Sequence, residues 1–201
     1  NGDDESAITA PTASTTADAT TAVGTYDITL SGGTADNYSL ITNNGSLTIG
    51  KATLTATAED KFKTYGEENP AFTITYSGFV NGDDESAILT PPTASTTADA
   101  TTGAGIYDIT LSGGTANNYS LITNNGSLTI GKATLTVTPD DQTRAVGQEN
   151  PELTLTYEGF VNGDTEADLD VTPTASTTAN NATPAGTALI TVGGGSDNNY
   201  D

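Results

Sequence analysis

The sequence repeats itself with a period of 81 residues, and this repeat constrains the fold more than any other feature. The segment Thr12–Thr55 aligns with Thr93–Thr136, and the only differences are Ala22/Gly103, Val23/Ala104, Thr25/Ile106 and Asp36/Asn117. The segment Asn81–Ile88 also recurs at Asn1–Ile8 and, in altered form, at Asn162–Leu169. We therefore expect each copy to be one structural unit that packs against its neighbours.

The period divides the chain into three parts. Residues 1–50 are the C-terminal part of one repeat, residues 51–131 are a complete repeat, and residues 132–201 are a partial repeat that lacks its last hairpin. Lys51 and Lys132 open the second and third copies. Because neither end of the chain coincides with a repeat boundary, we expect the chain to be a window of a longer repetitive protein.

Apolar and polar residues alternate within each copy, which is the pattern of half-buried β-strands. In the complete repeat Ala52, Leu54 and Ala56 alternate with threonines, and similar runs follow downstream. The Asn-Gly pair within Asn124-Asn125-Gly126 favours a tight turn with positive φ, so the segment Tyr119–Ile130 is predicted to be a hairpin. No stretch has helical periodicity. The predicted fold class is therefore all-β.

The spacing of strands and turns predicts a small immunoglobulin-like β-sandwich for each 81-residue repeat. Tyr107 resembles the buried tyrosine near the penultimate strand of such folds. A grasp-like single sheet per repeat, with a short helix around residues 85–89, is an alternative, because periodicity does not give the strand order. Only residues 131–134 separate the core positions of adjacent copies, so we expect the repeats to form an elongated, stiff rod.

Composition excludes several classes of function. The chain contains no Cys and no His, so thiol nucleophiles, thiolate or imidazole metal sites and histidine-dependent catalytic triads are ruled out. The formal net charge of −21 repels phosphates and anionic lipid headgroups, so we expect no nucleic-acid partner. No apolar run approaches the roughly 18 residues of a membrane span, so we expect no membrane insertion. The composition favours a protein that is not an enzyme and needs no cofactor.

Five spaced motifs of the complete repeat carry a resemblance to a known family. They are Lys51-Ala-Thr-Leu-Thr55, Tyr65-Gly66-Glu-Glu-Asn-Pro70, Gly78-Phe-Val-Asn-Gly-Asp83, Gly105-Ile-Tyr-Asp-Ile109, and Asn118-Tyr119 through Gly126-Ser-Leu-Thr-Ile130. In this order they resemble the MBG domain of the Tyr-Gly type, a tandem repeat of very large bacterial cell-surface and secreted adhesin-like proteins. The third copy has Val146 in place of the tyrosine of the Tyr-Gly pair. The resemblance implies an extracellular repeat without catalytic residues.

An acidic cluster recurs at the equivalent place in all three copies. Its members are Asp83, Asp84 and Glu85 in the second copy, Asp3, Asp4 and Glu5 in the first, and Asp164 and Glu166 in the third. Calcium takes about six to eight oxygen ligands, so these carboxylates are candidate calcium ligands, although their spacing is not that of an EF-hand loop. The alternative interpretation is a solvated acidic turn whose Asp side chains cap local backbone.

A covalent crosslink is a further hypothesis. Lys51 and Lys132 begin the first strands of their copies, and Asn124 and Asn125 precede a last strand, so an isopeptide bond between Lys and Asn is conceivable. The alternative interpretation is that each Lys shields a junction between repeats among acidic neighbours.

Near-identical tandem copies favour a length-setting or multivalent role over catalysis. The sequence therefore predicts a structural repeat segment, either a stalk or a filament body, of a long extracellular or cell-surface bacterial adhesin-like protein. The expected partners are neighbouring repeats or identical chains in a fibre. Two alternatives are an array of carbohydrate- or protein-binding modules, and a filament subunit whose incomplete first and last copies complete one another by strand exchange.

Overall fold

The structure is a computed structural model that describes residues 4–201. The described chain consists of short β-strands and of three 3-10 helices of three residues each, η1 (Glu5–Ala7), η2 (Glu85–Ala87) and η3 (Glu166–Asp168). The all-β fold class is confirmed. The short helix that the grasp-like alternative placed around residues 85–89 is η2, which ends where β9 (Ile88–Thr90) begins.

The chain forms two compact units, which are described separately. Of the described residues, the first unit comprises 4–57, 74–93 and 111–124, and the second comprises 58–73, 94–110 and 125–201. The joint between the first and second copies therefore falls within the first unit. The joint between the second and third copies falls within the second unit.

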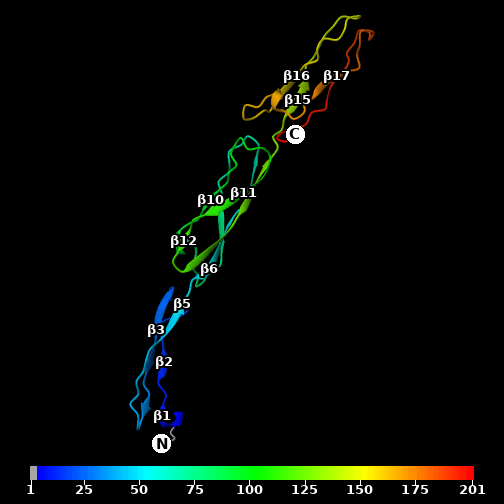
Figure 1. Ribbon diagram of the computed structural model, residues 1–201. Helices are drawn as coiled ribbons and strands as arrows, with labels where there is room; N and C mark the ends of the chain where they lie inside the picture. Colours follow the sequence, from blue (N-terminus) through cyan, green and yellow to red (C-terminus); the bar gives the residue numbers. More distant parts are fainter. Residues whose placement is uncertain (1–3) are drawn as a thin grey trace. The chain divides into compact units, whose positions relative to one another are not determined.

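The first unit contains two three-stranded sheets and two short two-stranded sheets (Figure 1). One three-stranded sheet is antiparallel and has the order β2 (Thr12–Ser14), β3 (Gly24–Ser31), β5 (Gly45–Ile49). The other has the order β13 (Tyr119–Asn124), β6 (Ala52–Ala58), β8 (Ile74–Ser77). The short sheets pair β1 (Ile8–Thr9) with β4 (Thr34–Ala35), and β9 with β12 (Thr115–Ala116).

The core of the first unit lies where these strands of the complete repeat meet. Leu54, Ile88, Ala116 and Tyr119 are buried there. The partly buried residues packed against them are Ala52, Tyr76, Phe79, Ala87 and Leu121. Burial alternates with period two along β6, as the sequence predicted, and Leu54 lies on the inward face of this strand.

The second unit is built around a four-stranded sheet and two antiparallel strand pairs. The order of the sheet is β10 (Thr93–Ser95), β11 (Gly105–Ser112), β14 (Gly126–Gly131), β7 (Lys61–Thr64). The pairs join β15 (Thr136–Pro139) to β16 (Leu155–Glu158), and β17 (Thr174–Thr177) to β18 (Ile190–Gly193). Ile109, Leu128 and Ile130 are the most buried aliphatic side chains of the sheet.

The segment Tyr119–Ile130 is not a hairpin, so this prediction was wrong. Its two strands pair in parallel with different partners: β13 pairs with β6 in the first unit, and β14 pairs with β7 in the second unit. The two asparagines before β14 are not among the residues with positive φ, so no hairpin turn forms. Gly126 is needed for space instead, because a Cβ there would lie 2.5 Å from the carbonyl oxygen of Ala58.

Candidate functional site

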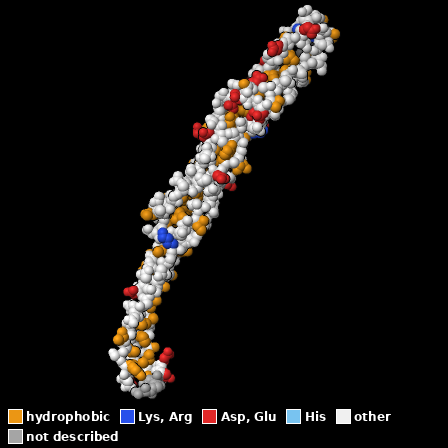
Figure 2. All heavy atoms as spheres, viewed as in Figure 1, with side chains coloured by type: hydrophobic (Ala, Val, Ile, Leu, Met, Phe, Trp, Pro, Cys, Tyr) orange, Lys and Arg blue, Asp and Glu red, His pale blue; other side chains and the backbone are white. Residues whose placement is uncertain are grey.

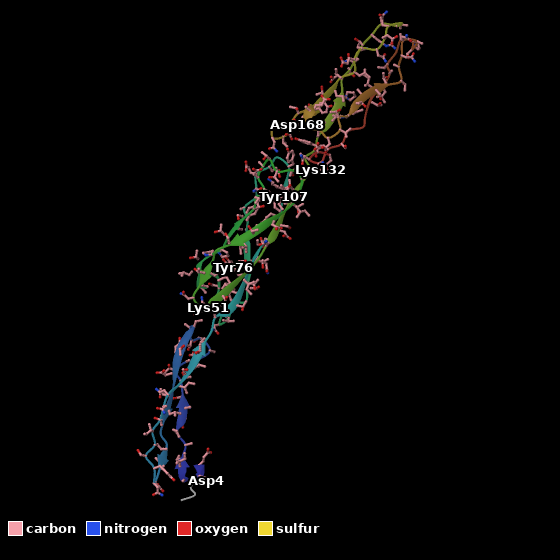
Figure 3. The ribbon with its side chains drawn as sticks, in the orientation of Figure 1. Asp4, Lys51, Tyr76, Tyr107, Lys132 and Asp168 are labelled. Atoms are coloured by element: carbon pink, nitrogen blue, oxygen red, sulfur yellow. The ribbon has the colours of Figure 1, made fainter. Side chains whose placement is uncertain are left out.

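Two members of the predicted acidic cluster, Asp4 and Asp84, cap 3-10 helices. The Oδ1 atoms of Asp4 and Asp84 accept hydrogen bonds from the backbone N–H groups of Ser6 and Ser86, each at 2.9 Å. The serine hydroxyl and then the serine N–H lower the pKa of each Asp, because both donate to the ionised form. Asp4 is labelled in Figure 3. These two residues have the capping role that the alternative interpretation gave them.

The other acidic residues of the cluster have separate roles. Asp83 and Asp164 accept hydrogen bonds from tyrosine hydroxyl groups, and Glu5, Glu85 and Glu166 begin the three 3-10 helices with exposed side chains. Asp3 lies outside the described residues. Within residues 4–201 no group of three or more acidic side chains is placed so that it could hold a metal ion. Figure 2 shows the carboxylates in small, separate groups on the visible face. Calcium binding stays a prediction.

A buried tyrosine organises this turn in the third copy. Tyr200 is 5 % exposed, and its hydroxyl donates to Asp164 Oδ2 at 2.6 Å. The same hydroxyl accepts the N–H of Val161 at 3.1 Å, and the ring meets Phe160 edge to face at 5.4 Å. The second copy repeats the arrangement with Tyr119, Asp83, Val80 and Phe79. The tyrosine therefore fixes the turn and the carboxylate together.

The tyrosine of the Tyr-Gly pair reaches from one copy into the next. Tyr65 belongs to the second copy, and its hydroxyl donates to Asp164 Oδ2 of the third copy at 2.9 Å. Its ring lies edge to face against Tyr200, with 5.6 Å between centroids and an interplanar angle of 87°. Only 7 % of Tyr65 is exposed. Asp164 thus accepts one tyrosine hydroxyl from each of two adjacent repeats, and we call this arrangement the tyrosine joint.

The glycine of the pair allows the close approach at the tyrosine joint. Gly66 has φ +88°, and a Cβ there would lie 2.5 Å from Cγ2 of Val161 in the next copy. Beside it, the side-chain amide of Asn162 donates to the carbonyl of Ala100 at 3.0 Å. Asn162 itself has φ +55°, one of two non-glycine residues in residues 4–201 with a positive φ. The turn of the third copy is therefore shaped to receive the Tyr-Gly loop.

A buried lysine holds the Tyr-Gly loop in shape. Lys63 is 3 % exposed, and its ammonium donates to the carbonyl groups of Glu67 at 2.9 Å and of Asp99 at 2.6 Å. The backbone N–H of Glu67 also donates to the carbonyl of Thr64 at 3.1 Å, which closes the turn around the Tyr-Gly pair. These contacts within its own repeat hold the loop in the conformation in which it meets the next repeat.

An asparagine side chain forms a second link across each joint. Asn199 Oδ1 accepts the backbone N–H of Ala104 from the preceding copy at 2.9 Å, and Asn118 Oδ1 accepts that of Val23 at 3.2 Å. A Cβ on Gly103 would lie 2.8 Å from Asn199 Oδ1, and the first copy has an alanine at the equivalent position. The longer bond, from Val23 to Asn118, is therefore at the joint where Ala22 adds a methyl group.

Tyr107 supports this second link from within its own copy. Its hydroxyl donates to the carbonyl of Gly103 at 2.9 Å, and Tyr26 makes the equivalent bond to Ala22 at the same distance. Each bond fixes the backbone just before β11 or β3, where the N–H group of Ala104 or Val23 binds the asparagine side chain. Tyr107 is labelled in Figure 3.

Sequence reasoning did not identify the tyrosine joint as a site. It used Tyr65-Gly66 and Gly78–Asp83 only as motifs of family identity, although the joint pairs the first motif with the next copy of the second. One signal in the sequence could have indicated the joint: the two motifs recur in a fixed order, and almost no linker separates one copy from the next. In the third copy Val146 replaces the tyrosine, and its side chain is 62 % exposed.

The tyrosine joint makes stability sensitive to alkaline pH. Burial, and then the hydrogen bond to Asp164, raise the pKa of Tyr200 from 10.0 to about 12, because phenolate is disfavoured beside a carboxylate. A raised folded-state pKa stabilises the fold fully below pH 10 and loses that contribution as pH rises towards 12. We expect the melting temperature to fall across this window while 13C-labelled tyrosine rings report late ionisation of Tyr200. Ionisation of Tyr200 near pH 10 would contradict this.

The lysines that open the copies bind backbone carbonyl groups. Lys51 Nζ donates to Ala116 O at 2.9 Å, and Lys132 Nζ donates to Asp197 O at 2.6 Å; both lysines are labelled in Figure 3. Asn124 lies at the opposite end of β13 from the strand start beside Lys51, and its amide donates to Thr57. The structure therefore does not bring Lys51 and Asn124 together for an isopeptide bond.

Comparison with known families gives one match, in three tandem segments. A family model described as the MBG domain (YGX type) matches residues 1–48, 54–129 and 135–201. Comparison with curated proteins and with solved structures finds no match. Among the described residues, no helix is long and apolar enough to cross a membrane.

Proposed function

Because the chain belongs to the MBG domain (YGX type) family and consists of three tandem copies of that domain, we propose that it is a load-bearing repeat segment of an extracellular bacterial surface protein. In this role it acts as a stalk or filament body of an adhesin-like molecule, without enzymatic activity. Near-identical copies and the absence of Cys and His support a passive structural role.

The observation that carries the proposal is the parallel pairing of the first two strands of the complete repeat, β6 and β7, with its last two, β13 and β14. In the first unit β6 pairs with β13 from Ala52↔Tyr119 to Thr57↔Asn124. In the second unit β7 pairs with β14 from Lys61↔Leu128 to Thr64↔Gly131. Tension along the chain pulls the start of the first strand against the end of the last. Parallel strands pulled in this way are sheared, so their hydrogen bonds are loaded together.

Single-molecule pulling with two attachment geometries tests this proposal. The chain has no Cys, so introduced cysteines define the points of attachment. Gly50→Cys with Asn124→Cys shears β6 against β13, whereas Thr57→Cys with Asn124→Cys loads the same pairs one at a time from one end. We expect a higher rupture force for the first pair of handles. Equal forces, or extension without a force peak, would contradict a load-bearing role.

The complete repeat should also release a characteristic length when the whole chain is pulled from its ends. Its 81 residues have a fully extended length of about 28 nm at roughly 3.5 Å per residue, and the gain in contour length is this value less the distance between the ends of the folded repeat. This length identifies which rupture event belongs to the complete repeat.

A further inference from the structure

Two buried tyrosines from adjacent copies meet at the tyrosine joint, edge to face, with 5.6 Å between ring centroids. The hydroxyl groups of Tyr65 and Tyr200 donate to the same atom, Asp164 Oδ2, at 2.9 and 2.6 Å. A shared acceptor brings together the hydroxyl ends of the two rings, where the Cε carbon atoms lie. These carbon atoms are the positions at which two oxidised phenols form a bond with each other.

We propose that Tyr65 and Tyr200 are a site of oxidative modification, at which a dityrosine crosslink joins the second and third copies. The co-reactant is a one-electron oxidant that reacts twice. Each phenol loses one electron and its hydroxyl proton, and a single bond then forms between one Cε atom of each ring. The hydrogen atoms of these two Cε atoms move to the two phenol oxygens. The product therefore has both hydroxyl groups and has lost two hydrogen atoms overall.

Asp164 supplies the proton acceptor for this step. Its Oδ2 atom already accepts a hydrogen bond from each phenol, so a phenol that loses an electron passes its proton along an existing bond. Asp164 is only partly buried, and the proton can pass from it to water. One carboxylate can therefore serve first one tyrosine and then the other.

The crosslink requires little movement of the two rings. A phenol oxygen lies on the Cγ–Cζ axis of its ring, so a turn about this axis moves the Cε atoms and leaves the oxygen at Asp164. The backbone is held at both tyrosines, because the N–H of Tyr65 donates to Gly131 O at 2.9 Å and that of Tyr200 donates to Asp197 Oδ1 at 3.1 Å. Reacting groups held in this way react far faster than the same groups on separate molecules.

Photo-oxidation of the full 201-residue chain tests the proposal. The probe is the ruthenium tris-bipyridine dication with persulfate, which takes up the two electrons and becomes two sulfate ions. The net charge of −21 attracts this cation. We expect a monomeric product that has dityrosine fluorescence and has lost the mass of two hydrogen atoms. Trypsin separates Tyr65, within residues 64–132, from Tyr200, within residues 145–201, so mass spectrometry should find these two peptides joined at these two tyrosines.

Three variants separate proximity from exposure. Tyr65→Phe keeps the ring and removes the phenol, whereas Tyr107→Phe removes a more exposed phenol whose hydroxyl donates to the carbonyl of Gly103. We expect the yield of dityrosine within the monomer to fall at least about tenfold in Tyr65→Phe and to be unchanged in Tyr107→Phe. Asp164→Asn keeps a hydrogen-bond acceptor but removes the base, and we expect it to slow crosslinking at least about tenfold.

Oxidation of the unfolded chain in urea completes the test. We expect the product that joins Tyr65 to Tyr200 to be lost there, because the folded joint no longer holds the rings together. An equal yield of this product from folded and unfolded chains would overturn the proposal. A crosslink between other tyrosines of the folded monomer, or an undiminished dityrosine yield in Tyr65→Phe, would do the same. The proposed mechanical role does not depend on this crosslink, so either test can fail alone.

Discussion

Replacing Tyr65 with alanine is expected to lower the free energy of unfolding of the second unit by about 3–5 kcal/mol, the range for removing a buried aromatic side chain. The change removes the edge-to-face contact with Tyr200 and leaves Asp164 with one tyrosine donor instead of two. Denaturant unfolding followed by circular dichroism and tyrosine fluorescence measures the effect. Because the chain has two compact units, their unfolding transitions are fitted separately.

Phe62→Ala is the matched control for this change. Phe62 lies three residues earlier, in β7, and its side chain is 64 % exposed, against 7 % for Tyr65. We expect its loss to cost less than about 1 kcal/mol, as for most surface substitutions. If the two alanine variants were equally stable, Tyr65 would not hold the repeats together.

Adding one methyl group to Gly66 is expected to destabilise the second unit by about 2–5 kcal/mol, because strain and steric overlap add. The backbone has φ +88°, and the new Cβ would lie 2.5 Å from the branched side chain of Val161. Gly147→Ala is the control, since Gly147 has φ +84° but no atom within 4 Å of its Cβ position. We expect it to cost about 1–2 kcal/mol from φ strain alone. Equal losses at the two glycines would show that the contact with Val161 carries no strain.

The strands of this chain were predictable from the sequence because alternation reports which residues face the core. Leu54 and Ala56 lie inward in β6 for this reason. The pairing of strands was not predictable, because Asn-Gly signals a tight turn only when the flanking strands pair with each other. In this fold β13 pairs with β6 and β14 pairs with β7, so the two strands that flank the Asn-Gly pair do not pair with each other. The segment Tyr119–Asn124 forms β13 by pairing in parallel with β6, a strand more than 60 residues earlier in the chain.

The contacts of the candidate site were likewise predictable where they are local in the sequence and not predictable where they are long-range. Capping by Asp4 and Asp84 could be predicted, because it depends on a serine two residues away. The role of Asp164 could not, since its two tyrosine partners lie 36 and 99 residues away. A cluster of carboxylates suggests a cation, and only the structure shows that Asp83 and Asp164 accept hydrogen bonds from tyrosine hydroxyl groups. Periodicity places equivalent residues in equivalent environments, but it does not say which motif of one copy meets which motif of the next.

The most direct test of the tyrosine joint is a double-mutant cycle between Tyr65→Phe and Asp164→Asn. These residues belong to different repeats, so coupling between them measures the link across the joint and subtracts the effect of Asp164 on Tyr200. A hydrogen bond to a charged group predicts a coupling free energy of about 1.5–3 kcal/mol. A coupling below about 0.3 kcal/mol, within the additivity expected of independent sites, would contradict a joint built on this contact.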